Sequence, residues 1–535
     1  MKTRLLLLCL LMASYQIDAQ CPGGTPDPGY TCIPDGNFEQ ALIDLNIDTN
    51  TTKDQQVLTS SIENLTSLDV SGYFISDLTG IEGFTSLQTL DCSSNNLIAL
   101  DLFENTLLTE INCNNNNIGN GGNLLVLPNN NTLTVLRCGN NNLSSLNVSG
   151  YPALDVLHVY NNTSNIGALD LTNQTVLTDL QCHNSGVSSL DIDQCALLQT
   201  LVCYGNNLNT LDISGNPDLM TLRCYNNSIG SLDFTNNTEL VYLDCGSNPL
   251  GAINVNLLTK LETLYCYYNG ISSLNVSNNT LLKRLDCGGN PSLTSINITM
   301  LSALERFWGY ENGFSSVDAS SNMMLQLINC NSNANLTSVM LPDTTTLIDV
   351  LLCCSKLGDV TFLPNHVNVD YVDVGINELT SLDVSNLQGL VTLWCNQNLL
   401  TSLNLKTGNI GIFSRLRARD NALTCVDVDD VALAQGKSDW QVDNGVTFAV
   451  NCTLSNDEFT ENKIALFPNP TRQSIHLRLA AEARYSIVNI MGKVVDEGIL
   501  GSGMNTVDLS HTANGIYFLT LSSPEGRTTK KIMKQ

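Results

Sequence analysis

Cysteine and histidine are the side chains of this chain whose chemistry is most specific, because thiolates and imidazoles bind metals and act in nucleophilic catalysis. The 535 residues include 19 Cys and 5 His. The sequence holds no H-E-x-x-H, no pair of C-x-x-C motifs, no G-x-S-x-G and no phosphate-binding loop. His158 and His183 stand 25 residues apart in neighbouring repeats. We therefore predict no catalytic residue, no metal site and no cofactor, and a protein that is not an enzyme.

Eleven of the cysteines recur at one position of an internal repeat, sixteen copies long, with a usual spacing of 21 or 22 residues. Leu219–Phe234 and Leu240–Val255 both begin L-x-x-L-x-C-x-x-N and continue with a second apolar half. The position is held in turn by Cys92, Cys113, Cys138, Val159, Cys182, Cys203, Cys224, Cys245, Cys266, Cys287, Gly309, Cys330, Leu352, Val374, Cys395 and Ala418. Strands in register lie about 4.8 Å apart, farther than the roughly 3.8 Å between the Cβ atoms of a disulfide. We interpret these cysteines as buried thiols that pack as small apolar residues.

The repeat also predicts the fold. In L-x-x-L-x-C the last two apolar residues are two positions apart, which is strand alternation, and the L-x-x-L-x unit occurs twice per copy. A coil of 21 residues cannot bury its apolar face alone, but stacked coils can. The pattern over residues 58–428 resembles the leucine-rich repeat family, and Ile75–Ile81 resembles internalin-like repeats. The resemblance implies a solenoid of parallel strands with little helix. It also implies that the Asn three residues after the Cys position bonds the backbone of neighbouring coils.

Both ends of such a solenoid need caps, because an open end would expose the core. We expect an N-terminal cap over residues 20–57, with a disulfide between Cys21 and Cys32. We expect a C-terminal cap over residues 429–452, with a Cys425–Cys452 disulfide.

The first residues have the features of an export signal. Lys2 and Arg4 precede the apolar run from Leu5 to Ala13, and Ala19 is a small residue suited to cleavage. Residues 1–19 are therefore predicted to be a signal peptide, which would place the cysteines in an oxidising compartment. Beyond it the chain has no run of 18 apolar residues, so no membrane span is expected.

The last residues form a second module. After a polar linker at 453–463, residues 464–535 alternate short apolar runs with turn residues, which predicts a small antiparallel β-sandwich. Its motifs are Pro468-Asn-Pro470, Ile490-Met-Gly492-Lys493, Asn505-x-x-Asp508, Asn514-Gly-Ile-Tyr517 and Lys530–Lys534. In this order they resemble the type A C-terminal sorting domain of type IX secretion. The resemblance implies export by the outer-membrane machinery of a Gram-negative bacterium, to the outer cell surface or the medium. A carbohydrate-binding sandwich is the alternative.

The charge excludes one class of partner. The net charge is −27 and the isoelectric point is near 4.3. Residues 21–460 carry 13 Lys and Arg against 44 Asp and Glu, whereas residues 461–535 carry 9 against 6. Because a nucleic-acid binder needs a basic face, no nucleic-acid partner is expected.

The exposed side of the predicted strands is where we expect function, since Tyr, Trp and Arg dominate binding interfaces. The candidate partner-binding residues are Tyr160, His183, Tyr204, Arg223, Tyr225, Tyr242, Tyr265, Tyr267, Arg284, Arg306, Trp308 and Tyr310, followed by Tyr371, Trp394, Arg415, Arg417 and Arg419. They predict a macromolecular partner, either a protein or a polysaccharide stacked on the rings. Strands also favour aromatic residues without any ligand. The alternatives are therefore a structural or adhesive surface component without a discrete partner, and an enzyme built from exposed residues.

A second row of polar residues recurs in the later half of the repeat. Asp170, Asp191, Asp212 and Asp233 are members of this row. Their oxygens could bind calcium, or they could form a solvated acidic face.

Overall fold

The computed structural model describes residues 26–122, 124–452, 466–479, 481–523 and 526–535. The predicted signal peptide and linker lie outside these residues. The chain divides into two compact units, residues 1–450 and 451–535, which are described separately. In the part that the structure describes, no helix is long and apolar enough to cross a membrane.

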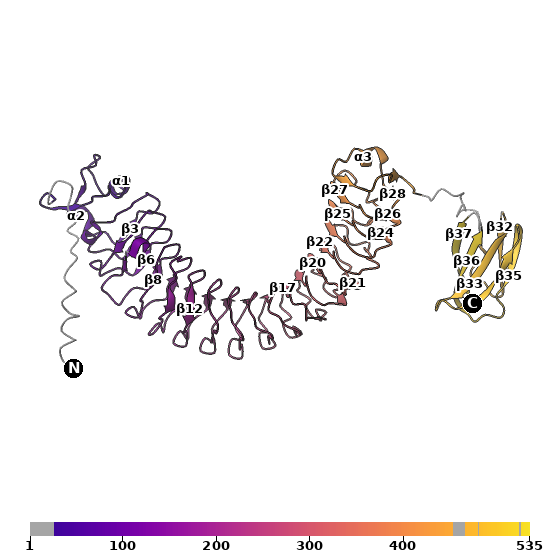
Figure 1. The fold of residues 1–535 in the computed structure, drawn as a ribbon, viewed down its shortest axis with the longest axis horizontal. Helices are drawn as coiled ribbons and strands as arrows, with labels where there is room; N and C mark the ends of the chain where they lie inside the picture. The colour runs from indigo at the N-terminus through magenta and orange to yellow at the C-terminus, as the bar shows by residue number, and fades with distance from the viewer. Residues whose placement is uncertain (1–25, 123, 453–465, 480, 524–525) are drawn as a thin grey trace. The chain divides into compact units, whose positions relative to one another are not determined.

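The first unit is a solenoid built on one parallel sheet of eighteen short strands (Figure 1). In order across the sheet they are β3 (Ser67–Asp69), β4 (Thr89–Asp91), β6 (Glu110–Asn112), β8 (Val135–Arg137), β9 (Val156–His158), β11 (Asp179–Gln181), β13 (Thr200–Val202), β14 (Thr221–Arg223), β15 (Tyr242–Asp244), β16 (Thr263–Tyr265), β17 (Arg284–Asp286), β18 (Arg306–Trp308), β20 (Leu327–Asn329), β22 (Asp349–Leu351), β23 (Tyr371–Asp373), β25 (Thr392–Trp394), β27 (Arg415–Arg417) and β29 (Trp440–Gln441). The sixteen predicted repeats supply β4 to β27, while β3 and β29 extend the sheet at its two ends. The predicted solenoid of parallel strands is confirmed.

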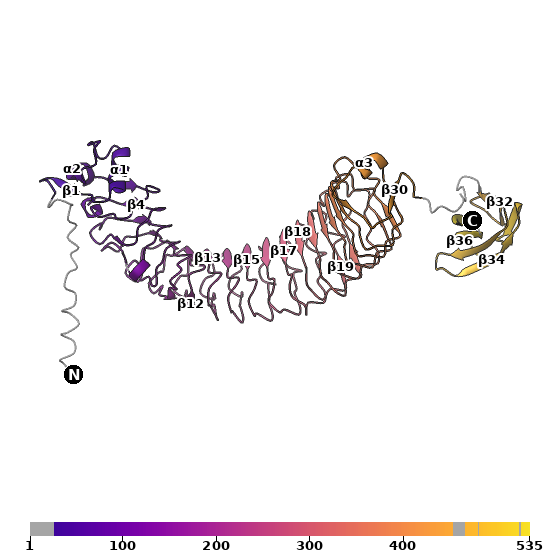
Figure 2. The same ribbon diagram turned by 45° about the horizontal axis from the view of Figure 1, so that its top comes forward.

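The sheet lines the inner, concave side of the curved stack (Figure 2). Strands also form on the opposite side, but only in some coils: β5 (Leu100–Asp101) with β7 (Leu125–Val126), β10 (Gly167–Leu169) with β12 (Val187–Leu190), β19 (Ser316–Asp318) with β21 (Ser338–Met340), and β24 (Ser381–Asp383), β26 (Ser402–Asn404), β28 (Cys425–Asp427) and β30 (Thr447–Ala449) together. In the middle of the stack the coils spread apart on the convex side, so their second segments stay extended without pairing. The expected second extended segment is therefore a paired strand in part of the repeats only.

Each strand ends in the same tight turn. The residue two positions after the Cys position has a positive φ in all sixteen repeats, for example 54° at Asn226 and 64° at Gly205. Asn and Gly tolerate this left-handed conformation better than other residues. The turn explains the many Asn and Gly residues that follow the cysteines.

The interior holds the leucines, the cysteines and a ladder of amides. The eleven ladder cysteines are free and fully buried. Asn116 donates through Nδ2 to the carbonyls of Cys92 (3.0 Å) and Cys113 (3.2 Å), while its Oδ1 accepts from the backbone N–H of Leu97 (2.9 Å). Similar bonds recur along the stack, as at Asn248. The expected role of this Asn, bonding neighbouring coils, is confirmed.

A second amide row, which the sequence analysis missed, stands thirteen residues after the Cys position. Asn216 donates to the carbonyls of Ile192 (3.0 Å) and Cys195 (2.8 Å), one coil earlier. Asn105, Asn237, Asn279 and Asn322 do the same in their coils. Cys195 occupies this position in its own coil and is buried, which explains why it stands outside the main cysteine ladder.

The two ends of the first unit carry its few helices. The N-terminal end contains β1 (Tyr30–Cys32), β2 (Gln56–Leu58), α1 (Gly36–Asp44), α2 (Thr59–Ile62) and the 3-10 turn η1 (Ile81–Gly83). Asp35 caps α1 by accepting from the N–H groups of Asn37 and Phe38, and Phe38 packs on Phe84 with ring centroids 6.2 Å apart. A second 3-10 turn, η2 (Asn120–Gly122), lies in the longest repeat, and α3 (Val431–Gln435) precedes Trp440, which packs on Phe413.

The second unit consists of two small antiparallel sheets around their own core, as predicted. One sheet contains β31 (Leu466–Phe467), β32 (Ser474–Leu479) and β35 (Gly503–Asp508), and the other contains β34 (Val494–Leu500), β33 (Ala483–Asn489), β36 (Gly515–Ser523) and β37 (Gly526–Lys534). Lys534 is buried at the end of β37, where its Nζ donates to the carbonyls of Leu509 (2.5 Å) and Thr512.

Candidate binding face

The outward side of the main sheet, called here the strand face, presents three columns of side chains. In β14, Leu222 and the following Cys224 are buried, whereas Thr221, Arg223 and Tyr225 are partly exposed. The first twelve candidate partner-binding residues, from Tyr160 to Tyr310, all lie in the corresponding positions of their repeats. The first strand residue gives Tyr242, Arg284 and Arg306, the third gives Arg223, Tyr265 and Trp308, and the residue after the Cys position gives Tyr160, His183, Tyr204, Tyr225, Tyr267 and Tyr310. Their role in binding stays a prediction.

Four of these side chains form one continuous stack, called here the aromatic column: Tyr160, His183, Tyr204 and Tyr225. The ring centroids are 4.7, 4.4 and 4.3 Å apart in that order, with interplanar angles of 4°, 20° and 10°. The strand spacing of a parallel sheet places equivalent side chains one coil apart, at the distance of stacked rings. His183 and Tyr204 therefore have a ring against each of their two faces.

Glycines make room for three of the tyrosines at the position after the Cys: Tyr160, which is at the end of the column, Tyr267 and Tyr310. A Cβ added at Gly139 would lie 2.8 Å from ring carbons of Tyr160, one coil later. At Gly246 it would lie 2.5 Å from Cε1 of Tyr267. The same holds for Gly288 and Tyr310. Each of these tyrosine rings consequently lies over the backbone of the preceding coil instead of projecting into solvent.

Arg223 is embedded among tyrosines beside the aromatic column. Its guanidinium carbon lies 5.3 Å from the ring centroid of Tyr204, 5.8 Å from that of Tyr225 and 5.9 Å from that of Tyr242. These are cation–π distances. Burial lowers the pKa of His183 to about 4, helped by the charges of Arg223 and His158, so the column is uncharged at neutral pH.

A second aromatic group lies next to it. Tyr242 meets Tyr265 edge-on at 5.9 Å, and Tyr265 meets Trp308 edge-on at 6.2 Å.

Arg284 and Arg306 are exposed and directly opposite each other on β17 and β18. Like charges in this arrangement repel, so this part of the face favours an anionic contact.

The sequence analysis missed that carboxyl groups of the strand face are covered: Asp244 is buried, and Asp286 is partly buried. Asp244 is only 4% exposed and accepts from the N–H of Gly246 at 3.4 Å, while Asp286 accepts from the N–H of Gly288 at 2.9 Å. Burial raises the pKa of each carboxyl to about 6. The sequence pattern that could have predicted this burial is Asp-Cys-Gly with a Tyr one coil after the Gly. The ring of that Tyr lies over the Gly and so covers the neighbouring Asp.

The row of Asp residues on the other side of the coil is explained by turns. Asp212 accepts from the N–H of Ser214 at 2.9 Å, and Asp233 accepts from the N–H of Thr235 at 2.9 Å. Asp170 and Asp191 bond Thr172 and Asp193 in the same way. Each carboxylate thus bonds the backbone two residues later, as in an Asx turn. Within the described ranges, no three His, Cys, Asp or Glu side chains gather as a metal site would require.

The remaining cysteines differ from the ladder. Cys32, Cys425 and Cys452 are disulfide-bonded, and Cys21 lies outside the described residues. The pairings Cys21–Cys32 and Cys425–Cys452 stay predictions. Cys353 and Cys354 are half-buried and free, with their sulfur atoms 2.6 Å apart.

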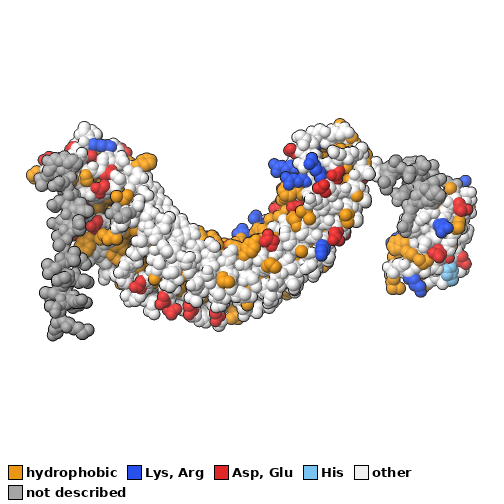
Figure 3. Space-filling view, viewed as in Figure 1, with side chains coloured by type: hydrophobic (Ala, Val, Ile, Leu, Met, Phe, Trp, Pro, Cys, Tyr) orange, Lys and Arg blue, Asp and Glu red, His pale blue; other side chains and the backbone are white. Residues whose placement is uncertain are grey.

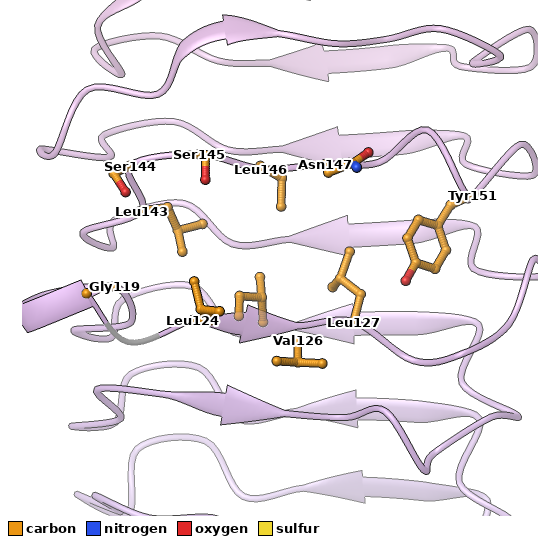
Figure 4. Close-up of a pocket in the computed structure, with 12 residues that line it drawn as sticks. Gly119, Leu124, Val126, Leu127, Leu143, Ser144, Ser145, Leu146, Asn147 and Tyr151 are labelled. Atoms are coloured by element: carbon orange, nitrogen blue, oxygen red, sulfur yellow. The ribbon is translucent and has the colours of Figure 1, made fainter. Parts of the chain in front are cut away.

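A hollow of about 350 Å³ lies away from the strand face (Figure 4). It opens beside β7, where Leu124 and Leu127 face residues 143–147 of the next coil, with Tyr151 at one end. β7 pairs with β5 on its other side. The hollow follows from the longest repeat, whose extra residues leave the neighbouring second segments unpaired.

Comparisons with known proteins agree with the repeat fold of the first unit and with the predicted class of the second. Residues 465–535 match the family described as the secretion system C-terminal sorting domain. The functional domain of InlJ from Listeria monocytogenes, described as including a cysteine ladder, is 24% identical with a TM-score of 0.51, covering 95% of this chain and 99% of that chain. The leucine-rich repeat ectodomain of the Arabidopsis thaliana receptor kinase GASSHO1/SCHENGEN3 is 20% identical with a TM-score of 0.53, covering 70% and 51%. No curated protein sequence matches the chain significantly.

The chain is a leucine-rich repeat solenoid with a secretion-system sorting domain. The repeats resemble those of the internalins, and the sorting domain implies export to the cell surface or the exterior of a Gram-negative bacterium. In this leucine-rich repeat protein the strand face is the concave side of the solenoid, and its columns are set by the repeat.

Proposed function

We propose that the protein binds another protein through its strand face, without catalysing a reaction, after export from the cell. The observation that carries this proposal is the aromatic column with Arg223 packed against it. Tyr and Arg are the residues that contribute most to protein interfaces. Here their conformations are fixed before binding by stacking at 4.3 to 4.7 Å, which lowers the entropy lost on association.

The covered ring faces favour a protein over a polysaccharide. A sugar stacks on the face of an aromatic ring, but both faces of His183 and Tyr204 are occupied by neighbouring rings. The tyrosines of the column are partly exposed, and their hydroxyl groups can accept and donate hydrogen bonds. The GASSHO1/SCHENGEN3 ectodomain, a solenoid of similar fold, was solved in complex with CASPARIAN STRIP INTEGRITY FACTOR 2.

We further infer that export follows the type IX route. Residues 1–19 would direct the chain across the inner membrane, and residues 464–535 would be recognised by the outer-membrane machinery. The match to the sorting-domain family supports this inference.

The experiment that tests the binding proposal is affinity capture with the mature chain. Partners would be collected from surface proteins of the producing bacterium and of its neighbours, and in parallel from a glycan array. The wild type is compared with Tyr225→Ala, which removes the end of the column, and with Asp212→Asn on the other side. We expect one protein that loses at least tenfold affinity for Tyr225→Ala and is unaffected by Asp212→Asn. A glycan bound with the same dependence on Tyr225 would overturn the choice of a protein.

A further inference from the structure

Three arginines lie at alternate positions on the strand face near the C-terminal end of the solenoid: Arg415 and Arg417 on β27, and Arg419 just after it, beyond the buried Ala418. All three are exposed, whereas Leu416 and Ala418 point into the core. Figure 3 shows Lys and Arg side chains gathered on the concave side near this end of the solenoid. Residues 21–460 contain only 13 basic residues, so three within residues 415–419 is a concentration that the acidic composition does not explain. We call these residues the arginine site.

The three guanidinium groups make no close ion pair in the part of the chain that the structure describes, although Arg417 is near enough to Asp373 to oppose the rise that burial causes in the pKa of that carboxyl. The ion pairs among the residues that the structure describes are His158–Asp179, Lys260–Glu239, Lys283–Glu262 and Lys406–Asp427. None of them involves the arginine site. Three like charges at alternate residues repel one another, and an external anion in close contact would reduce that repulsion.

Arg417 is held in place by an aromatic side chain on the adjacent strand. Its guanidinium carbon lies 4.3 Å from the ring centroid of Trp394, and Trp394 is in turn fixed edge-on against Tyr371 at 5.3 Å. Stacking occupies the face of the guanidinium and leaves its N–H edge free. A planar, fixed N–H edge is suited to bidentate contact with a carboxylate.

A polar hollow of about 250 Å³ adjoins this edge. It is lined by Arg417, Arg419, Asn396, Gln441 and Asp420. The amides of Asn396 and Gln441 offer further donors. The nearby carboxylate of Asp443 is already engaged, because it accepts from the N–H groups of Asp420 (2.9 Å) and Asn421 (3.0 Å).

We propose that the arginine site binds an acidic, extended segment of the protein partner, with carboxylates at alternate residues. Alternate residues of an extended chain such as β27 and the two residues after it are about 6.6 Å apart, at about 3.3 Å per residue. An extended peptide presents its own alternate side chains with the same repeat. An Asp/Glu-x-Asp/Glu-x-Asp/Glu segment lying along residues 415–419 therefore meets Arg415, Arg417 and Arg419 in register. This inference rests on the proposed protein-binding function and gives one part of the partner its chemistry.

The test is a fluorescence titration of the mature chain with a labelled Glu-Thr-Glu-Thr-Glu peptide. The controls are a Glu-Glu-Glu-Thr-Thr peptide of equal charge, a Gln-Thr-Gln-Thr-Gln peptide, and polygalacturonate as a carbohydrate polyanion. We expect the alternating peptide to bind at least fivefold more tightly than the block peptide. Binding should fall at least tenfold in the double variant Arg417→Gln/Arg419→Gln. Arg417→Lys should lose about fivefold, because it keeps the charge but not the planar edge.

A matched control on the same face is Arg137→Gln at the far end of the sheet, which should change the affinity less than twofold. All these side chains are at the surface, so the thermal midpoint of the variants should match that of the wild type. Equal affinity for the alternating and block peptides, tighter binding of polygalacturonate, or no peptide binding would each overturn the proposal. None of these results would bear on the proposed role of the aromatic column in binding. That role is tested separately, by affinity capture with the Tyr225→Ala variant.

Discussion

The ring of Tyr267 lies over Gly246, the residue one coil earlier at the same position of the repeat. The Tyr267 ring fills the space that a side chain at residue 246 would need, so this pair couples two coils on the strand face. Replacing Gly246 by Ala would place a Cβ 2.5 Å from Cε1 of Tyr267. We expect the ring to be displaced and the free energy of unfolding to fall by about 1–2 kcal/mol, as in other overpacked sites.

The control for this prediction is Gly230→Ala in the preceding coil. A Cβ there meets no atom within 4 Å, and Gly230 has no positive φ. Urea unfolding of both variants measures the difference. The double variant Gly246→Ala/Tyr267→Ala should cost less than the sum of its two single changes, because removing the ring relieves the clash. Additive costs would contradict the coupling.

The buried carboxyl of Asp244 gives a prediction about pH. Its pKa is raised to about 6 by burial, from an ordinary value of 3.8. A group whose folded pKa is raised favours the folded state when it is neutral. The stability that protonated Asp244 contributes is therefore fully present below about pH 4 and is lost as the pH rises through 6. Asp244→Asn stays neutral and should raise the free energy of unfolding by about 1–3 kcal/mol at pH 8.

The same variant should have little effect at pH 4, which urea titrations at the two pH values would measure. Asp212→Asn is the comparison, since its exposed carboxylate has a lowered pKa from its bonds to Ser214. That variant should not become more stable at pH 8. A gain for Asp244→Asn that is equal at both pH values would show that charge burial is not the cause.

The thiols should divide into three classes. The eleven ladder cysteines are fully buried, and burial raises the pKa of Cys182 and its neighbours, so native alkylation should leave them unmodified. Cys353 and Cys354 should react faster, and Cys21–Cys32 and Cys425–Cys452 should be recovered as disulfides. Mass spectrometry after alkylation with and without denaturant checks all three classes. Ladder cysteines linked to one another in the native protein would contradict the packing.

The sorting domain contains a lysine whose position suggests a structural role. Lys534 is buried and donates to Leu509 and Thr512 carbonyls, whereas Lys531 on the same strand is exposed. Lys534→Ala should destabilise the domain and leave most of the protein in the periplasm of a type IX-competent host, as should deletion of residues 464–535. Lys531→Ala should be exported normally. Cell fractionation measures the distribution, and surface display of the deleted chain would remove the sorting role.

The sequence was sufficient to predict the solenoid and the side on which each residue lies, because the 21-residue period repeats the same alternation sixteen times. It was not sufficient to predict how far an outward residue is covered. Asp244 occupies an outward position, yet it is buried because tyrosine rings of the strand face lie over the backbone beside it. The pairing of second segments also depends on curvature, which no single repeat encodes. The Asp row could have been assigned to turns, since Ser or Thr often follows it by two residues.

The central claim is that a partner contacts the strand face and not the other sides of the coil. Its most direct test is photo-crosslinking of the exported full chain, with benzoylphenylalanine placed at Thr221 on β14 or, as the control, at Asp212. Thr221 is partly exposed beside Arg223 and outside the aromatic column, so the stack stays intact. We predict one discrete protein adduct from position 221 and none from position 212. An adduct from 212 without one from 221 would contradict the account and move the binding surface to the opposite side.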